Sequence, residues 1–244
     1  AVPGRIRSHN VVVCNVYRAP DASDVFALTQ RFCDWMNSDD FIDNRMSLHF
    51  SIIKAVTAHL YLAWIHPFGD GNGRVARLLE FAILLGSGVP SPAAHVLSNH
   101  YNMTRGRYYS QLGRASKTSD PAGFFSYAIE GLRDGLDEQL QFVQRHLVDV
   151  CWRDYIYEVF RKHGSPAVSK RRRELALRIS TLDAPLDKNG ILLLMRHEYR
   201  NRTEKTLARD LNELERMHLI AACKGQYTAN KDLILQFRPF AGSL

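Results

Sequence analysis

Apolar residues at helical spacing recur through the first two thirds of this 244-residue chain, and this periodicity constrains the fold most strongly. Polar and glycine-rich segments separate the patterns, without any internal repeat or low-complexity tract. Helices are expected at residues 21–36, 47–65, 73–85, 103–115 and 121–161. The pattern predicts a mainly α fold, with one helical domain at residues 1–163 whose core lies at about residues 3–140.

Short β-branched runs near the N-terminus predict a small β-hairpin before the first helix. The runs lie at residues 11–13 and 16–17, and Cys14 and Asn15 separate them. Aspartates follow at residues 21 and 24, where the positive end of a helix dipole favours them. We therefore expect a hairpin that leads directly into the first helix.

The second part of the chain has a different pattern. His-Gly-Ser-Pro at residues 163–166 indicates a domain boundary. One strongly periodic helix and two short strands around a glycine turn follow, at residues 203–217, 219–223 and 227–230. This order predicts a small α+β winged helix-turn-helix domain at residues 164–244.

Charge also divides the chain into two parts. Residues 1–150 carry equal numbers of basic and acidic side chains, so residues 151–244 account for the whole net charge of +7. A neutral first part joined to a basic second part indicates two units with different partners.

Cysteine usage and hydropathy predict a cytoplasmic protein. The four cysteines have neither metal-ligand nor C-x-x-C spacing, which favours buried free thiols in a reducing compartment. No signal peptide is recognisable, and the apolar run at residues 81–85 is far shorter than the ~20 residues of a membrane span. We expect no contact with a membrane.

Residues that could take part in catalysis or binding concentrate at residues 66–77, between two expected helices. The sequence of this segment is His-Pro-Phe-Gly-Asp-Gly-Asn-Gly-Arg-Val-Ala-Arg. Gly71 and Gly73 flank Asn72 at a helix start, where unpaired N–H groups and the helix dipole favour a bound anion. Arg74 and Arg77 lie three residues apart, so both guanidinium groups can contact neighbouring phosphates. The segment therefore predicts a phosphate-binding site.

Two further residues of this segment add reactivity. Asp70 offers a hard oxygen ligand for a Mg²⁺ ion shared with phosphate oxygens. His66 can act as the general base for an incoming hydroxyl. Each feature alone has an ordinary reading, as a turn, a capping histidine or a solvated helix face. Together, and without a P-loop pattern in the chain, they predict a nucleotide phosphate transfer site.

This segment resembles the signature of the Fic family, H-x-F-x-[D/E]-G-N-G-R-x-x-R, at every position. The resemblance covers about residues 3–140, because residues 3–20, Tyr108 with Tyr109, and residues 120–125 also resemble family segments. It implies a mainly helical domain that transfers AMP from ATP to a Ser, Thr or Tyr hydroxyl of a target protein and releases pyrophosphate.

The resemblance also implies residue roles. His66 would deprotonate the target hydroxyl, Phe68 would anchor the loop, and Asp70 would hold Mg²⁺ against the α- and β-phosphates. The implied ATP-binding residues are Gly71, Asn72, Gly73, Arg74, Arg77, Tyr108 and Tyr109. Arg77 would position the γ-phosphate, and the two tyrosines would line the adenine pocket. The alternative for both tyrosines is an ordinary position in the helical core.

The expected hairpin resembles the family's flap, which would hold an extended target segment by strand addition. Its residues are Val11, Val12, Val13 and Cys14. Cys14 stands where glycine is common in relatives. The anion loop with Gly73 and Arg74 follows the AMP-transferring form rather than that of the relative Doc, which transfers the γ-phosphate. UMP, GMP and other nucleotide donors stay open.

An inhibitory helix with the pattern [S/T]-x-x-x-E-[G/N] regulates many relatives. Residues 126–131 fit this pattern, but they fall within an expected core helix, and we interpret the match as coincidence. An inhibitory helix would then lie upstream of Ala1 or come from a partner.

Residues 203–214 and 218–220 resemble the recognition helix and following strand of the winged helix modules in many bacterial Fic proteins. Residues that could contact DNA are Lys205, Thr206, Arg209, Lys224 and Lys231. The alternative is a dimerisation or target-docking module, since acidic residues at 210, 213 and 215 make the helix nearly neutral. The basic run at residues 170–173 could be a solvated face.

The sequence thus predicts a protein adenylyltransferase that uses ATP and Mg²⁺ and acts on a target protein. A homodimer and DNA contact through the winged helix are further partner expectations. The competing hypothesis is a DNA-binding transcriptional regulator that uses the Fic fold as a nucleotide sensor.

Overall fold

A two-stranded antiparallel hairpin precedes the first helix, which confirms the expected N-terminal element. β1 (Val12–Val13) pairs with β2 (Tyr17–Arg18), and Val13 lies opposite Tyr17. The N–H of Ala19 also donates to the carbonyl of Val11 at 3.3 Å. The computed structural model describes residues 4–13, 17–41, 47–161 and 165–235, so Cys14 lies outside the described residues.

The chain divides into two compact units, Ala1–Leu140 and Gln141–Leu244. This division falls before the boundary expected at residues 163–166, because α7 (Ala122–Arg161) is one continuous helix. Its last turns carry Trp152, Ile156 and Phe160 into the core of the second unit. Residues 163–166 follow the end of this helix, whereas the change of hydrophobic core comes earlier.

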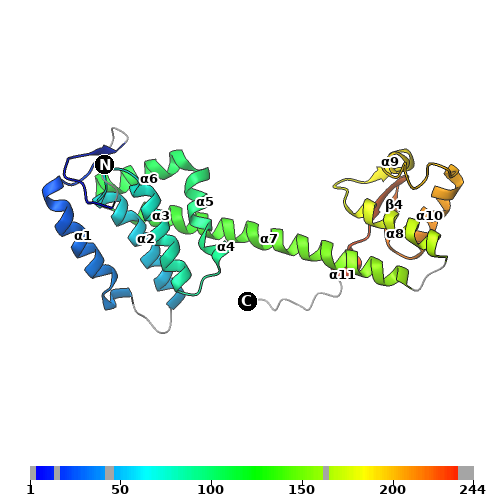
Figure 1. The fold of residues 1–244 in the computed structure, drawn as a ribbon, viewed down its shortest axis with the longest axis horizontal. Coiled ribbons are helices and arrows are strands. Elements are labelled where there is room, and N and C mark those ends of the chain that lie inside the picture. Colours follow the sequence, from blue (N-terminus) through cyan, green and yellow to red (C-terminus); the bar gives the residue numbers. More distant parts are fainter. Residues whose placement is uncertain (1–3, 14–16, 42–46, 162–164, 236–244) are drawn as a thin grey trace. The chain divides into compact units, whose positions relative to one another are not determined.

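The first unit is mainly helical, as expected (Figure 1). Its described helices after the hairpin are α1 (Ala22–Met36), the 3₁₀ helix η1 (Asp39–Phe41), α2 (Ser47–Ile65), α3 (Asn72–Gly86), α4 (Ser91–Ala94), α5 (Val96–Met103), α6 (Arg105–Thr118) and the first part of α7. The helices expected at residues 21–36, 47–65 and 73–85 are confirmed. The sequence did not predict α4 and α5, because so few turns show little periodicity.

Helix α2 lies between two hydrophobic clusters of the first unit. Val56 and Leu60 pack into the cluster that includes α5 and α7 residues, whereas Leu62 and Ile65 pack with α1. A helix buried on two sides is apolar around most of its circumference. Residues 48–65 therefore have the length and composition of a membrane span, with a mean hydropathy of 1.3, but 44% of them are buried inside the structure.

Residues 55–65 of this helix form a longer uncharged run than the apolar run at residues 81–85, which is too short for a membrane span. Length and composition alone are weak grounds for a membrane span, because the core helix of a folded domain has the same properties.

The second unit combines helices with a three-stranded antiparallel sheet. After the end of α7, its elements are α8 (Pro166–Ser180), β3 (Leu186–Asp187), α9 (Lys188–Leu194), α10 (Glu204–Arg216), β4 (Ile220–Cys223), β5 (Gln226–Ala229) and α11 (Asp232–Leu235). The strand order is β3-β5-β4, with Ala222 opposite Tyr227. This order of elements supports the winged helix-turn-helix interpretation, which stays a prediction.

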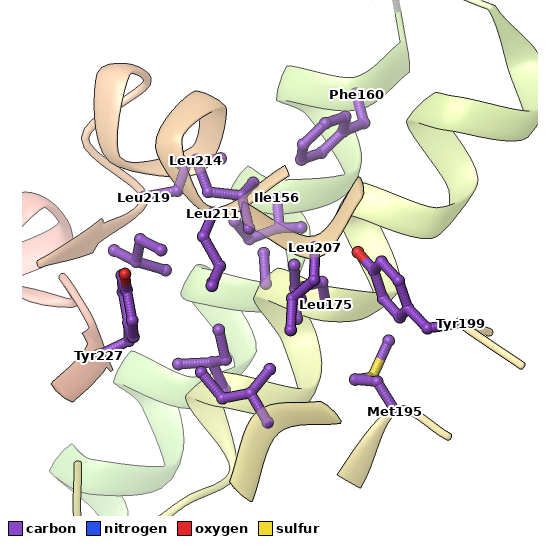
Figure 2. Close-up of a cluster of buried hydrophobic side chains, with 14 of the residues drawn as sticks. Ile156, Phe160, Leu175, Met195, Tyr199, Leu207, Leu211, Leu214, Leu219 and Tyr227 are labelled. Atoms are coloured by element: carbon purple, nitrogen blue, oxygen red, sulfur yellow. The ribbon is translucent and has the colours of Figure 1, made fainter. Parts of the chain in front are cut away.

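One hydrophobic core holds the second unit together. Figure 2 shows Leu207, Leu211 and Leu214 of α10 pointing into it, beside Leu175 of α8 and Ile156 of α7. All five side chains are at most 3% exposed. Because most of the free energy of folding comes from such burial, α10 presents a fixed opposite face to the solvent.

The cysteines differ from their expected environment. Cys33, Cys151 and Cys223 are free thiols, as predicted, but they are exposed rather than buried. Phe32 and Trp152, the neighbours of Cys33 and Cys151, face the core, and these two thiols take outer positions of their helices.

Candidate functional site

A cavity of about 310 Å³ lies in the first unit, where the hairpin, the end of α2, the start of α3 and helix α6 meet. Its lining residues are Val13, Tyr17, Ala63, Trp64, His66, Gly73, Arg77, Tyr108, Tyr109, Ser110, Leu112 and Gly113. This volume is at the lower end of the range for small-molecule sites. The cavity brings together residues from three sequence segments that the motif and the resemblance had singled out separately.

His66 lies immediately after α2, with a φ of 51°. Its Nδ1 is 3.2 Å from the carbonyl oxygen of Ala63. A carbonyl only accepts hydrogen bonds, so Nδ1 carries the proton, and the lone pair of the neutral ring is on Nε2. Burial lowers the pKa of His66, and the positive charge of Arg7 adds to this, while the bond to Ala63 acts in the opposite direction. The neutral, basic form of the imidazole is therefore favoured.

The side chain of Asn72 locks the loop that follows His66. Its Oδ1 accepts from the N–H of Phe68 at 2.8 Å, and its Nδ2 donates to the carbonyl of Phe68 at 2.7 Å. Asn72 is 2% exposed. This amide thus acts on the loop backbone, so any contribution of Asn72 to an anion site comes from its main-chain N–H.

The start of α3 has the features of an anion site. Gly71 precedes the helix in a left-handed conformation, with a φ of 84°, and no side chain caps the first N–H groups. Gly73 and Arg77, on the first turns of α3, both line the cavity. A Cβ atom at position 73 would lie 3.5 Å from Nη1 of Arg77, so a larger side chain there would meet the guanidinium. The helix dipole and Arg77 both favour a bound phosphate.

Arg74 and Asp70 lie on the solvent side of this loop. Nη2 of Arg74 is 3.1 Å from Oδ2 of Asp70, and the side chains are 73% and 82% exposed. Neither residue lines the cavity. Asp70 and Arg74 are thus beside the cavity, whereas Gly73 and Arg77 are part of its wall.

Asp70 can hold a metal ion only together with a ligand. In the parts of the chain that the structure describes, no three His, Cys, Asp or Glu side chains are grouped for metal binding. One exposed carboxylate suits Mg²⁺, which usually keeps several waters and takes other oxygens from substrate phosphates. The residues present therefore fit a Mg²⁺ ion shared between Asp70 and a nucleotide.

The two tyrosines of α6 occupy different environments. Tyr109 is 41% exposed, whereas Tyr108 is 4% exposed and belongs to the hydrophobic core. Both line the cavity. The core alternative thus describes Tyr108 well, and Tyr109 offers the more accessible ring to a ligand.

A buried polar cluster contacts Tyr108. The hydroxyl of Tyr108 is 2.9 Å from Nε2 of His59, and Nδ1 of His59 is 3.3 Å from Oε2 of Glu80. Tyr101 donates to the other oxygen of Glu80 at 2.9 Å. Burial raises the pKa of Tyr108, so its hydroxyl stays protonated. The hydrogen bonds of His59 with Tyr108 and of Tyr101 with Glu80 fix the tyrosine ring. Among the described residues, Nδ1 of His59 and Oε2 of Glu80 have no hydrogen-bond partner.

Sequence reasoning missed Arg7, which fixes the segment that carries His66. Its side chain donates to the carbonyls of His66 at 2.8 Å, His9 at 2.8 Å and Pro20 at 2.5 Å. Arg7 is only 4% exposed. A lone arginine near a chain terminus has no helical or strand periodicity that would predict such a position.

We expect Arg7→Met to lower the free energy of unfolding by roughly 2–4 kcal/mol, because three carbonyls lose the charged donor that a buried side chain supplies. Urea denaturation followed by circular dichroism would measure this change. Arg5→Met is the control, since Arg5 is exposed. Equal stability of the two variants would contradict a structural contribution of Arg7.

The remaining residues that the sequence singled out in the first unit lie apart from these contacts or beyond the described part. Val12 is 60% exposed on β1, and Val13 faces the cavity. Glu130, in the inhibitory-like pattern, lies on α7 and pairs with Arg107 of α6 at 3.3 Å. It is not part of the cavity wall, which agrees with our interpretation of the pattern as coincidence.

In the second unit, the three arginines of the basic run at residues 170–173 are partly buried, whereas Lys170 is exposed. Nε of Arg171 is 2.7 Å and Nε of Arg172 is 2.8 Å from the carboxylate of Asp210. The guanidinium of Arg173 lies over the ring of Tyr157 at 4.6 Å. These three arginines make contacts within the unit, so their charges are not free for a partner.

The residues that the sequence named as candidates for DNA contact also divide into paired and exposed ones. Lys231 pairs with Asp149 at 2.6 Å. Lys205, Arg209 and Lys224 are exposed and have no ion pair among the described residues, and Thr206 is half-buried. The start of α10 therefore keeps its positive charge on the surface.

Comparisons with known proteins find relatives of the first unit. Residues 2–84 match the model of the Fic/DOC family. A protein adenylyltransferase Fic from Drosophila willistoni is 41% identical over 87 residues, which are 36% of this chain and 16% of that protein. A protein of the same name from Nematostella vectensis is 35% identical over 113 residues, which are 46% of this chain and 24% of that protein.

A solved structure extends the likeness in fold. The crystal structure of a Fic family protein from Desulfovibrio desulfuricans G20 matches 93% of this chain and 62% of that one, with a TM-score of 0.50 and 19% sequence identity. The chain spans between a sixth and a quarter of the two curated relatives' lengths.

Proposed function

We propose that this chain, whose residues 2–84 match the model of the Fic/DOC family, is a protein adenylyltransferase that transfers AMP from ATP to a hydroxyl group of a target protein. The observation that carries the proposal is that His66, Gly73 and Arg77 line the same cavity. A base and a phosphate-binding helix start thus face the same space. The names of the two relatives above support this activity.

The cavity walls suggest how ATP binds. The triphosphate would lie at the start of α3, where unpaired N–H groups and Arg77 stabilise its charge. The adenine ring would lie against Tyr109, whose exposed face can stack on a base. Arg74 can turn from Asp70 to a phosphate, because both side chains are largely exposed. A Mg²⁺ ion at Asp70 would neutralise charge on the phosphate oxygens.

The reaction requires one proton transfer and one displacement at phosphorus. Nε2 of His66 accepts the proton of the target hydroxyl, and the hydroxyl oxygen forms a bond to the α-phosphorus. The bond between the α-phosphorus and the oxygen that bridges to the β-phosphate breaks, and pyrophosphate leaves. Arg77 and the start of α3 stabilise the charge that develops on the leaving group.

The hairpin is suited to hold the target segment beside His66. Val13 and Tyr17 line the cavity, and the hydroxyl of Tyr17 donates to the carbonyl of Trp64 at 2.8 Å. Tyr17 thereby anchors β2 to the end of α2, next to the base. An extended target could pair with β1, placing its hydroxyl over the cavity.

Labelling with two forms of ATP tests the proposed function. The chain is incubated with Mg²⁺ and a bacterial lysate, and with ATP carrying ³²P in either the α- or the γ-phosphate. We expect protein-bound label from α-labelled ATP only. Label from γ-labelled ATP only would indicate phosphate transfer instead. ATP binding without any label would favour the nucleotide-sensing regulator.

A further inference from the structure

Helix α10 has two opposite faces of different chemistry. Leu207, Leu211 and Leu214 point into the core of the second unit (Figure 2). Asp210 is buried as well. Lys205, Arg209, Asn212 and Arg216 follow one another at spacings of four, three and four residues, which places them on the opposite side of the helix. All four are exposed. We call these four residues the outer stripe.

The outer stripe contains no acidic residue, although the sequence of α10 is nearly neutral. Asp210 is turned inward, where it binds Arg171 and Arg172 and accepts a hydrogen bond from Tyr199 at 2.8 Å. Glu213 pairs with Arg172 at 3.8 Å and with Arg216 at 2.7 Å. Asp210 therefore does not neutralise the surface of the helix, whereas Glu213 still pairs with Arg216 and Glu215 is exposed.

The polar groups of the stripe are available to a ligand. Among the described residues, Lys205, Arg209 and Asn212 have neither an ion pair nor a side-chain hydrogen bond, and only Arg216 is paired. The connection between α9 and α10 adds three exposed arginines, at positions 196, 200 and 202, against the exposed acids Glu198 and Glu204. Positive charge therefore predominates at the start of α10.

We propose that the outer stripe of α10 binds double-stranded DNA. A helix fits the major groove, where arginine recognises guanine and asparagine recognises adenine by paired hydrogen bonds. Lys205 and the arginines before α10 can neutralise phosphates. The helix follows α9 after a turn, as a recognition helix does, and precedes a β-hairpin whose tip is Lys224 and Gly225.

The composition of the stripe favours DNA over a protein partner. Protein interfaces have an apolar centre that is depleted of charge, and the outer stripe has no apolar side chain. A nucleic-acid interface is instead rich in positive charge and in groups that donate hydrogen bonds. DNA binding would add a second activity to the chain and does not depend on the proposed AMP transfer.

Fluorescence anisotropy with a labelled duplex of mixed sequence and roughly 20 base pairs tests this proposal on the full chain. The stripe variant is Lys205→Gln with Arg209→Gln. The matched control is Arg153→Gln with Arg178→Gln, which removes the same charge from exposed positions on α7 and α8. Circular dichroism verifies that both variants are folded.

We expect the wild type to bind the duplex at about 50 mM salt and to weaken steeply towards about 200 mM. The stripe variant should lose at least about tenfold in affinity, and its slope of log affinity against log salt should decrease by about two. The control should bind within about twofold of the wild type.

Absence of wild-type binding at the lower salt, or equal losses in both variants, would overturn the proposal. A stripe variant that keeps its DNA affinity but changes from dimer to monomer in light scattering would overturn it in favour of a protein interface. None of these measurements uses ATP, so failure here is distinct from failure of the adenylyltransferase proposal.

Discussion

His66→Ala lowers the rate of AMP transfer by about 10²–10⁴-fold, the range expected for loss of a general base. The imidazole is held by Ala63 through Nδ1, which leaves Nε2 to accept the hydroxyl proton. Alanine removes this acceptor, while Gly73, Arg77 and Tyr109 stay in place to bind ATP. We therefore expect the loss in kcat, with ATP affinity nearly unchanged, as measured by α-labelled ATP and by calorimetry.

The control is His49→Ala, since His49 is an exposed residue of the same helix α2. It should retain full activity. Equal rates for wild type and His66→Ala would contradict the assignment of the base, and loss of ATP binding in His66→Ala would assign the residue to nucleotide binding instead.

The pH dependence provides a second measurement on His66. Burial lowers its pKa below the usual value of 6.5, so the ring is neutral at pH 7. A base acts in its unprotonated form, so the rate should be level above pH 6.5 and fall only at lower pH. A rate that still rises between pH 7 and about pH 8 would contradict a lowered pKa.

Asp210→Ala destabilises the second unit by roughly 2–4 kcal/mol. The carboxylate is buried and holds Arg171, Arg172 and the hydroxyl of Tyr199. Alanine leaves these donors without their acceptor, and the cost is moderated because Arg172 can turn towards the solvent. Hydrogen exchange followed by mass spectrometry of α8 and α10 would measure the loss within this unit alone.

Glu215→Ala is the matched control, because Glu215 is an exposed acid on the same helix. Its exchange rates should equal those of the wild type. If hydrogen exchange in Asp210→Ala were as slow as in the wild type, the positions of Arg171 and Arg172 would not depend on this carboxylate.

Asp210 also makes the second unit sensitive to acid. Burial alone would raise its pKa, but the hydrogen bonds from Arg171, Arg172 and Tyr199 outweigh it and hold the pKa below the usual 3.8. The stabilisation is therefore fully present above the pKa of the unfolded chain and is lost as the pH falls through the lower folded value. Wild type and Asp210→Ala should converge in stability in strong acid.

Local patterns predicted most of the first unit. The helices at residues 22–36, 47–65 and 72–86 follow from apolar periodicity, and the hairpin follows from two short β-branched runs. The same reasoning missed α4 and α5, which are too short for periodicity. It also placed the domain boundary after α7, because the sequence marks the end of a helix more clearly than a change of core.

The candidate site was predictable as a set of residues but not as a geometry. The motif at residues 66–77 named the base and the anion site, because their spacing along the chain is fixed. It did not show that Arg77 faces the cavity while Arg74 and Asp70 lie outside it. It also did not predict Arg7, whose contacts are with carbonyls far away in the sequence.

The sequence by itself determined the helical fold, the reactive segment and the excess of positive charge in the second part. Tertiary structure alone decided which of these charges are free. Residues 171 and 172 look available in the sequence, yet they bind Asp210, whereas Lys205 and Arg209 stay on the surface. The physical reason is that a buried carboxylate must be paired, and only packing determines which side chains reach it.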